Sequence, residues 1–376
     1  MLGHDMSSII GEQVREKLIK PFVDIEVKVC DLSICNRNET DNMATLRRFN
    51  CSMKSATIKV ERDVMEMYQL KRMWQPPSSA IRNALAGALF RDPIVRANVP
   101  PLIKQWRKPI VVDRHAFGDQ HLGRDLMVPG PVSLDVRYKS PIGSPYNMQL
   151  YDLKDIEGVV AVMSSTDKSI MEFAHACFQF ALRRNLPLYL STKETILKRY
   201  DGRFKVIFER LYEKHEPKFK DVRIFQHSLM DDMVARSLGT EGSFVCACKN
   251  NDGDIQSGFV ARGFGSLGLI DALICPDGRT ILADVAHGTV TKHFHRYEAG
   301  RETSTNSMAT IFTWTKEIRH RVKLDGDTKL VNFARTLEKV VIQLFESGYI
   351  TKEIVMCVRG LCNVRREDYQ NTFRIH

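Results

Sequence analysis

Segments with helical periodicity alternate with short β-type segments along most of this chain of 376 residues. Apolar residues recur at helical spacing over 9–19, 79–90 and 169–184, whereas the runs at 25–30 and 110–112 have the apolar and β-branched composition of strands. Helical and strand periods that alternate in this way predict an α/β fold, in which helices cover a sheet. Because the chain is longer than one ordinary domain, we expect on the order of two to three units.

One tract interrupts the alternation. Residues 117–155 contain eight glycines or prolines and the alternating stretch 132–138. Glycine and proline at this density punctuate short strands and turns, so we expect a small β-rich insertion. We find no linker on either side of it, which indicates that the domains interleave along the chain.

Charge and composition exclude several classes of protein. Fifty-five Lys and Arg outnumber forty-five Asp and Glu, for a formal net charge of +10, which favours anionic partners such as a polycarboxylate or a phosphorylated cofactor. The basic residues are dispersed and form no aromatic-basic RNA motif, so no nucleic-acid binding is expected. No apolar run approaches the ~18 residues of a bilayer span, so no membrane insertion is expected either.

The N-terminus and the cysteines indicate the compartment. Residues 1–8 have neither the pattern of a secretion signal nor that of a transit peptide, which predicts a cytoplasmic location. The nine cysteines are odd in number and scattered, which favours reduced core residues over a disulfide framework. Cys246 and Cys248 share a face of an expected strand, but they lack a second pair of ligands at zinc spacing.

Three patterns carry candidate chemistry, and each has an ordinary structural alternative. Residues 287–293 combine a glycine, two threonines, a lysine and two histidines, as in a phosphate cradle or an ordinary turn. Asp231 and Asp254 are candidate Mg²⁺ ligands, or else cap and turn residues. Three arginines would clamp a multiply charged carboxylate or form surface ion pairs: Arg82, Arg91 and Arg114.

Short blocks spread over nearly the whole chain resemble the eukaryotic NADP-dependent isocitrate dehydrogenases. The blocks are collinear with those of that family and include Arg114-His-Ala-Phe-Gly-Asp-Gln120, Pro187-Leu-Tyr-Leu-Ser-Thr-Lys193, Asp231-Asp-Met-Val-Ala235, Ala286-His-Gly-Thr-Val-Thr291 and Glu302-Thr-Ser-Thr-Asn306. The resemblance implies oxidative decarboxylation of isocitrate to 2-oxoglutarate with reduction of NADP.

The resemblance also implies an architecture. The expected fold is α/β and isocitrate/isopropylmalate dehydrogenase-like, with a large α/β domain at 1–85 and 265–376 and a small α/β domain at 86–117 and 166–264. A β-rich clasp at 118–165 would join two subunits into a homodimer.

Site residues follow from the resemblance position by position. It implies two catalytic residues, Lys193 and His121, and two ligands of Mg²⁺ or Mn²⁺, Asp231 and Asp254. Lys193 and Asp231 would serve the partner's site. The implied substrate-binding residues are Arg82, Arg91, Arg114, Ser78 and Thr195. The implied NADP-binding residues are Lys54, Thr57, His287, Gly288, Thr289, Val290, Lys292, His293, Thr305 and Asn306.

Five positions depart from the family pattern. Gly258 replaces a metal-binding aspartate, His121 an acid/base tyrosine, and Lys59 an active-site threonine; residues 76–78 read Pro-Pro-Ser instead of Ser-Pro-Asn. Losing a metal ligand weakens the Lewis acid, and losing the tyrosine removes a proton donor. We therefore expect an isocitrate dehydrogenase of weak or lost activity and metal binding. The alternative is a pseudoenzyme homodimer with a scaffolding role and a structural protein as partner.

Overall fold

The computed structural model describes residues 3–36, 49–95, 99–153, 157–219, 225–265, 270–274, 279–285, 288–326 and 328–374. The chain divides into two compact units. The first comprises Met1–Phe117 and Asp167–His376, and the second comprises Gly118–Thr166.

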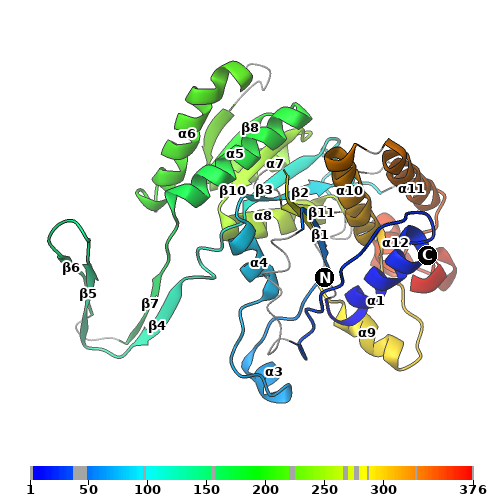
Figure 1. Ribbon diagram of the computed structural model, residues 1–376, viewed down its shortest axis with the longest axis horizontal. Helices are drawn as coiled ribbons and strands as arrows, with labels where there is room; N and C mark the ends of the chain where they lie inside the picture. The colour runs from blue at the N-terminus through cyan, green and yellow to red at the C-terminus, as the bar shows by residue number, and fades with distance from the viewer. Residues whose placement is uncertain are drawn as a thin grey trace. The chain divides into compact units, whose positions relative to one another are not determined.

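An eight-stranded mixed sheet runs through the first unit in the order β1-β12-β11-β2-β3-β10-β8-β9 (Figure 1). Its strands are β1 (Cys51–Lys54), β12 (Ile281–Val285), β11 (Ile270–Ile274), β2 (Ala88–Pro93), β3 (Ile110–His115), β10 (Phe244–Cys248), β8 (Leu188–Thr192) and β9 (Phe225–Leu229). Strands β3, β10, β8 and β9 are mutually parallel, so their carboxyl ends lie at one edge, where open α/β sheets bind ligands. The sheet is continuous through the expected large and small domains, and that division stays a prediction.

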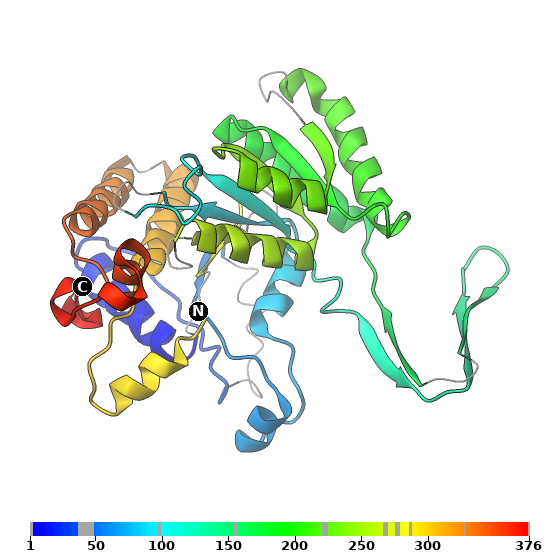
Figure 2. The ribbon, with the colours of Figure 1, turned by 180° about the vertical axis from the view of Figure 1, so that it is seen from behind.

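Helices α5 (Asp167–Arg184) and α6 (Tyr200–Phe219) cover one face of this sheet (Figure 2). The cluster beneath them is aromatic, with Phe173, Phe204 and Phe208 packed on small strand residues such as Ala247. The apolar side chains of α5 recur at helical spacing, so one face of the helix is buried.

Helices α7 (Met230–Gly239), α8 (Asn250–Gly263) and α4 (Pro77–Leu85) present their apolar residues to two further clusters of strand side chains. Trp106 is fully buried beside α8, and its indole Nε1 donates to the carbonyl of Ser237. A Cβ at Gly263 would lie 2.0 Å from this indole, so only glycine permits the contact.

The remaining helices are α1 (Asp5–Val14) with a π-helical extension (Arg15–Ile19), α3 (Arg62–Met67), α9 (Thr291–Glu298), α10 (Met308–Asp325), α11 (Thr328–Glu346) and α12 (Lys352–Arg359), followed by 3₁₀ turns at Leu361–Asn363, Arg366–Asp368 and Thr372–Arg374. Helices α1, α10 and α11 bury a common apolar cluster. No helix among the described residues has both the length and the apolar character that a bilayer span requires.

The second unit consists of two antiparallel ribbons. Strand β4 (Arg124–Val128) pairs with β7 (Gly158–Val162), and β5 (Val132–Tyr138) pairs with β6 (Tyr146–Leu153). One face of the β5–β6 ribbon is apolar because Leu134, Val136 and Tyr138 lie opposite Tyr151, Met148 and Tyr146. Several of these side chains are exposed in the single chain.

Strand β3 buries a carboxyl group in the aromatic cluster under α5. Asp113 is 0 % exposed, and burial raises the pKa of its carboxyl well above the ordinary value of 3.8, with only partial opposition from the Cys177 thiol. The folded chain therefore holds a proton that the unfolded chain releases near pH 4. Stability from this group is complete below pH 3.8 and is lost as pH rises, at about 1.4 kcal/mol per pH unit until the folded pKa is reached.

We therefore expect Asp113→Asn, which cannot ionise, to become more stable than the unmodified protein as pH increases from 5 to 8. Urea unfolding at each pH measures the difference in free energy. A difference that stays constant across this range would contradict a buried neutral carboxyl at position 113.

Candidate active site

A row of charged residues crosses the sheet from β1 to β3. Lys54 pairs in register with Asp284, and Asp284 and Arg91 both pair with the same residue of β11. Arg91 lies opposite Val112, and Arg114 follows two residues later on β3. Residues in direct register, and residues two apart on a strand, share a face of the sheet. The four charged side chains therefore project to one side.

The Asp284 carboxylate bridges two cations at this face. Its Oδ1 lies 2.9 Å from Lys54 Nζ, and its Oδ2 accepts a hydrogen bond of 2.9 Å from Arg82 Nη2 on α4. Lys54 is 2 % exposed and Asp284 is 3 % exposed, so both charges are removed from water. A buried carboxylate shared in this way fixes the separation of the ammonium and guanidinium groups.

Helix α8 anchors the guanidinium of Arg114. Its Nη1 forms an ion pair with Asp254, and its Nη2 donates to Asn250 Oδ1 at 2.9 Å. Asn250 Nδ2 in turn donates to the carbonyl of His115 at 2.8 Å. A Cβ at Gly253 would lie 2.8 Å from Arg114 Cβ, so the close approach of α8 to β3 requires glycine there.

Positive charge is in excess among the described pairs at this face, because Lys54, Arg82 and Arg114 share the carboxylates of Asp284 and Asp254. Burial lowers the pKa of Arg114 to about 9; Arg82 and Arg91 add to this effect, and Asp254 opposes it. Burial also lowers the pKa of Lys54, against the attraction of Asp284. Burial alone would raise the pKa of Asp284, but Lys54 and Arg82 outweigh it and hold that pKa below its usual value. Each cation repels the others, so a multiply charged anion would relieve this repulsion.

Lys193 and Asp231 follow the carboxyl ends of the neighbouring parallel strands β8 and β9. They form an ion pair with each other, and Asp231 is largely exposed. Thr195, in the loop after β8, is also exposed. Two partners of opposite charge at an exposed edge are available to a second chain, but within one chain they neutralise each other.

The two predicted metal ligands do not form a metal site in the single chain. Asp231 pairs with Lys193, and Asp254 pairs with Arg114. No cluster of three or more His, Cys, Asp or Glu side chains suited to a metal occurs in the part of the chain that the structure describes. Gly258 lies one turn after Asp254 on α8, and a Cβ there would meet open space. The residues present therefore fit a three-carboxylate ion site poorly, although the backbone leaves room for the missing side chain.

The predicted nucleotide loop is described from Gly288 onward, and His287 lies outside the described residues. The Thr289 and Thr291 hydroxyls lie 2.9 Å apart, and Thr291 donates to Asp5 at 2.5 Å. Val290 has a left-handed φ of 58° just before α9 begins. The contact with Asp5, the first residue of α1, thus fixes the start of α9. The backbone N–H groups in the first turn of a helix have no partner within the helix, so they favour an anion there.

Two further residues of the predicted nucleotide site, Thr305 and Asn306, also have defined side-chain contacts. His293 Nδ1 lies 2.7 Å from Thr305 Oγ1, and the Thr305 N–H donates to Thr372 Oγ1 at 2.9 Å. Asn306 Oδ1 accepts the Met308 N–H, while its buried Nδ2 has no hydrogen-bond partner among the described residues. An unsatisfied buried donor is costly, so this amide is available to a ligand acceptor. Lys292 and Gly288 are exposed, and Thr57 is half-buried.

The positions that depart from the family pattern lie on α4, on the loop after β1, on α8 and in the second unit. Pro76 precedes α4, Pro77 opens it, and Ser78 lies in its first turn. Lys59 is exposed. His121 belongs to the second unit, so its position relative to the arginines stays a prediction.

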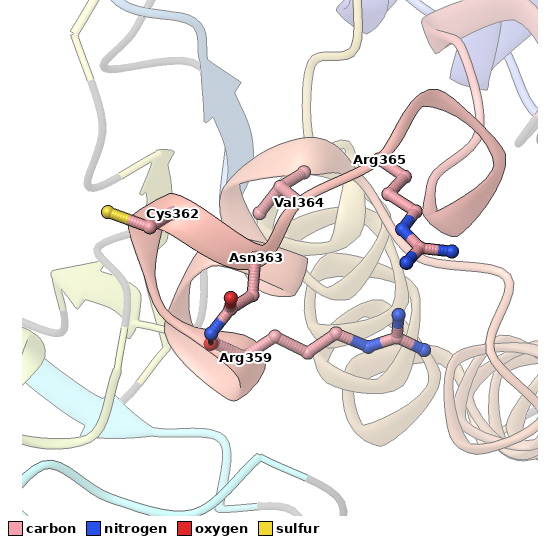
Figure 3. Close-up of a pocket in the computed structure, with 5 residues that line it drawn as sticks. All are labelled: Arg359, Cys362, Asn363, Val364 and Arg365. Carbon is pink, nitrogen blue, oxygen red and sulfur yellow. Dashed lines mark hydrogen bonds between the residues drawn. The ribbon is translucent and has the colours of Figure 1, made fainter.

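Two surface hollows contain none of the predicted site residues. One, of about 620 Å³, is lined by Arg359, Cys362, Asn363, Val364 and Arg365; the two arginines extend to the same side and Cys362 points away (Figure 3). Arg359 pairs with Asp368 and Arg365 with Glu367, so the hollow offers no excess charge. The other, of about 530 Å³, lies among residues 24–30, 49–53 and 314–321. Both are less suited to a polycarboxylate than the buried cations.

Three of the residues that organise this site are absent from the predicted set: Asp284, Asn250 and Gly253. Each is joined to a predicted residue that is remote in sequence, Asp284 to Arg82 and the other two to Arg114. The local signals were the position of Asp284 inside an apolar strand and of Asn250 two residues after the end of one.

A sequence profile of the isocitrate/isopropylmalate dehydrogenases matches residues 1–365. The chain belongs to this family. Its relatives include mitochondrial NADP isocitrate dehydrogenases of Bos taurus, 46% identical over 99% of this chain and 84% of the relative, and of Sus scrofa, 45% identical over 99% and 91%. The family resemblance and the α/β fold class predicted from sequence are thus confirmed.

Membership of the isocitrate/isopropylmalate dehydrogenase family corrects one expectation. The cytoplasmic location predicted from residues 1–8 is wrong, because the NADP isocitrate dehydrogenases that match almost the whole chain are mitochondrial proteins. The prediction relied on a short segment that carries no packing information, whereas the relatives match the whole fold.

Proposed function

We propose that the protein is a mitochondrial, homodimeric NADP-dependent isocitrate dehydrogenase that binds isocitrate and NADP but turns isocitrate over slowly. The observation that carries this proposal is the buried face on which Lys54, Arg82 and Arg114 share the two carboxylates of Asp284 and Asp254, with Arg91 close enough to Arg114 to affect its pKa. Isocitrate has three carboxylates, and guanidinium groups bind carboxylates in bidentate geometry. The clasp and the large and small domains keep their expected bounds under this proposal.

Slow turnover follows from the chemistry of the departures. A divalent ion would supply a Lewis acid that polarises the substrate hydroxyl and later the ketone. Asp231 and Asp254 are both engaged with cations of the chain, and Gly258 offers no carboxylate. A histidine at 121 is shorter than tyrosine and presents its N–H in another direction. Single losses of this kind cost about 10²- to 10³-fold in rate.

Titration calorimetry with isocitrate, with and without Mg²⁺, tests the binding part of the proposal. We expect isocitrate to bind and Arg82→Gln to weaken that binding at least ~10-fold, because a guanidinium–carboxylate pair is lost. The matched control is Arg319→Gln, which removes an exposed guanidinium paired with Glu338 on the remote α10–α11 pair. Absence of isocitrate binding by the unmodified protein would contradict the proposal.

Nucleotide preference gives a separate prediction. We expect NADP⁺ to raise the melting temperature more than NAD⁺ at equal concentration, because Lys292 at the start of α9 would pair with the 2′-phosphate. Lys292→Ala should remove the difference, whereas Arg296→Ala, later on the same helix, should preserve it. Equal shifts with both nucleotides would contradict the assignment of NADP.

A second copy of this chain is the partner that we propose for the β5–β6 ribbon. An isolated two-stranded hairpin is marginally stable in water. This ribbon also exposes an apolar face, whereas Asp135 and Arg137 lie on its polar face, opposite Gln149 and Asn147. Pairing with a second copy would bury the apolar face and bring Lys193 and Asp231 to the partner's site, as the resemblance implies.

Light scattering after size exclusion is expected to give twice the chain mass of 43.0 kDa. Val136→Asp should weaken the dimer at least ~10-fold, because it places a charge on the apolar face of the ribbon. Arg137→Asp, on the opposite face, is the matched control and should stay dimeric. A stable folded monomer of the unmodified chain would refute the assembly.

The alternative function is a pseudoenzyme homodimer with a scaffolding role and a structural protein as partner. It is favoured by the pairing of both predicted metal ligands with cations of the same chain. Isocitrate-dependent NADPH formation above background, with Mg²⁺ or Mn²⁺, would exclude this alternative.

A further inference from the structure

A single buried carboxylate joins two arms of the candidate site that come from different strands. Asp201, in the first turn of α6, is 0 % exposed. Its Oδ2 accepts the backbone N–H of Lys193 at 2.6 Å, and its Oδ1 lies 2.8 Å from Lys249 Nζ. Lys193 follows β8 and Lys249 follows β10, and these strands are parallel neighbours. The carboxylate therefore spans the ends of two adjacent strands.

The first arm is the loop that carries Lys193. The carbonyl of Lys193 accepts the N–H groups of Ile196 and Leu197, at 2.9 and 3.0 Å. These two hydrogen bonds close the loop into a tight turn that begins at Lys193. The N–H of Lys193 points instead to Asp201. Hydrogen bonds to an ionised acceptor are about twice as strong as neutral ones. Asp201 thus fixes the backbone from which the Lys193 side chain extends.

The second arm leads from Lys249 to Arg114. Lys249 is the residue before α8, and its carbonyl accepts the Gly253 N–H at 2.8 Å. The next residue, Asn250, accepts a hydrogen bond from Arg114 Nη2. A shift of Lys249 would therefore move the first turn of α8, which orients Arg114.

A stability role alone does not account for this arrangement. Lys249 is 9 % exposed at its side chain and Asp201 is 0 % exposed, so the pair is desolvated on both sides. The cost of removing such charges from water offsets most of their attraction, and an apolar pair of similar volume would stabilise the fold equally well. Unlike an apolar pair, the carboxylate also fixes the orientation of the two arms, because one of its oxygens contacts the Lys193 N–H and the other contacts the Lys249 ammonium.

We propose that Asp201 is a positioning residue that holds the backbone of Lys193 and the start of α8 in a fixed relation, and thereby sets the affinity for isocitrate. The proposal rests on the proposed function, since Lys193 and Arg114 act there on isocitrate. In the proposed dimer Lys193 serves the partner's site and Arg114 its own, so one carboxylate sets the geometry of both.

The test compares Asp201→Asn with the double variant Asp201→Asn/Lys249→Met. The asparagine keeps the size of the side chain and one acceptor, but it leaves the Lys249 ammonium with only its longer ion pair of 3.5 Å to Asp252, and the second substitution removes that charge. Melting temperature reports stability. Titration calorimetry with isocitrate and amide hydrogen exchange at residue 193 and in the first turn of α8 report position.

We expect Asp201→Asn to lower the melting temperature and the double variant to recover it. Isocitrate affinity should fall about 10-fold in both variants, and exchange at residue 193 should accelerate about 10-fold in both, because the charge-assisted bond is lost in each. Recovery of affinity and of slow exchange in the double variant would overturn the proposal, since Asp201 would then only balance the charge of Lys249.

Hydrogen exchange separates this proposal from the proposed function. If the unmodified protein binds no isocitrate, the function fails, while faster exchange at residue 193 in both variants still supports the positioning role. Unchanged exchange in both variants overturns that role, whether or not isocitrate binds.

Discussion

Replacing four of the five departed positions together, as Gly258→Asp, His121→Tyr, Pro76→Ser and Ser78→Asn, is expected to raise isocitrate-dependent NADPH formation at least ~10²-fold. The aspartate adds the missing carboxylate to the metal site, and the tyrosine supplies the proton donor. Serine and asparagine restore polar contacts at the start of α4. A single lost group of this kind costs about 10²- to 10³-fold, and such effects are not additive.

The single variants serve as controls for this result. Gly258→Asp alone should tighten Mg²⁺ binding without harming the fold, because a Cβ at 258 meets open space and a helix-interior glycine is removed. It should leave turnover low, because a stronger Lewis acid does not replace the proton donor. Full recovery of turnover in either Gly258→Asp or His121→Tyr alone would contradict the view that the missing metal ligand and the missing proton donor each limit the rate.

Gly253→Ala is expected to lower isocitrate affinity about 10- to 100-fold and to destabilise the fold by about 1–3 kcal/mol. The added Cβ would lie 2.8 Å from Arg114 Cβ and 3.0 Å from its Cα, so either α8 or the arginine must move. Movement of either one breaks the contacts of Arg114 with Asp254 and Asn250. Calorimetry with isocitrate and urea unfolding measure the two effects.

Gly258→Ala is the matched control for this substitution. It lies on the same helix, but its Cβ has nothing within 4 Å. Alanine in a helix interior is favoured over glycine by about 1 kcal/mol, so this variant should be as stable as the unmodified protein or more stable. Equal losses of isocitrate affinity at 253 and 258 would refute a steric role for Gly253.

The sequence predicted the layered α/β architecture well because it rests on periodicity, which is local. Element boundaries were less predictable. A helix was expected at 79–90, but α4 ends at Leu85, and Ala86 and Gly87 have left-handed φ values of 60° and 80° before β2 begins. The glycine was the available signal for this break. The expected strand at 25–30 is not assigned as a strand and forms no ladder with another described segment, since a strand forms only where a neighbour pairs with it.

The candidate site, like the element boundaries, was only partly predictable from local sequence patterns. Its arginines were identified singly from the resemblance, and the fold brings Arg82 and Arg114 to acidic partners more than a hundred residues away. Asp284 and Asp201 were not predicted. Their importance arises from strand register and from contacts between strand ends, which periodicity and local motifs do not encode.

The initial rate of NADPH formation by the unmodified protein, with saturating isocitrate, NADP⁺ and Mn²⁺, tests the central claim most directly. An NADP isocitrate dehydrogenase with the complete set of metal ligands and the tyrosine, assayed in parallel, is the reference. We expect an isocitrate-dependent rate at least ~10²-fold below the reference, because two chemical groups are missing while the buried cations remain. A rate equal to the reference would contradict the proposed loss of catalytic power.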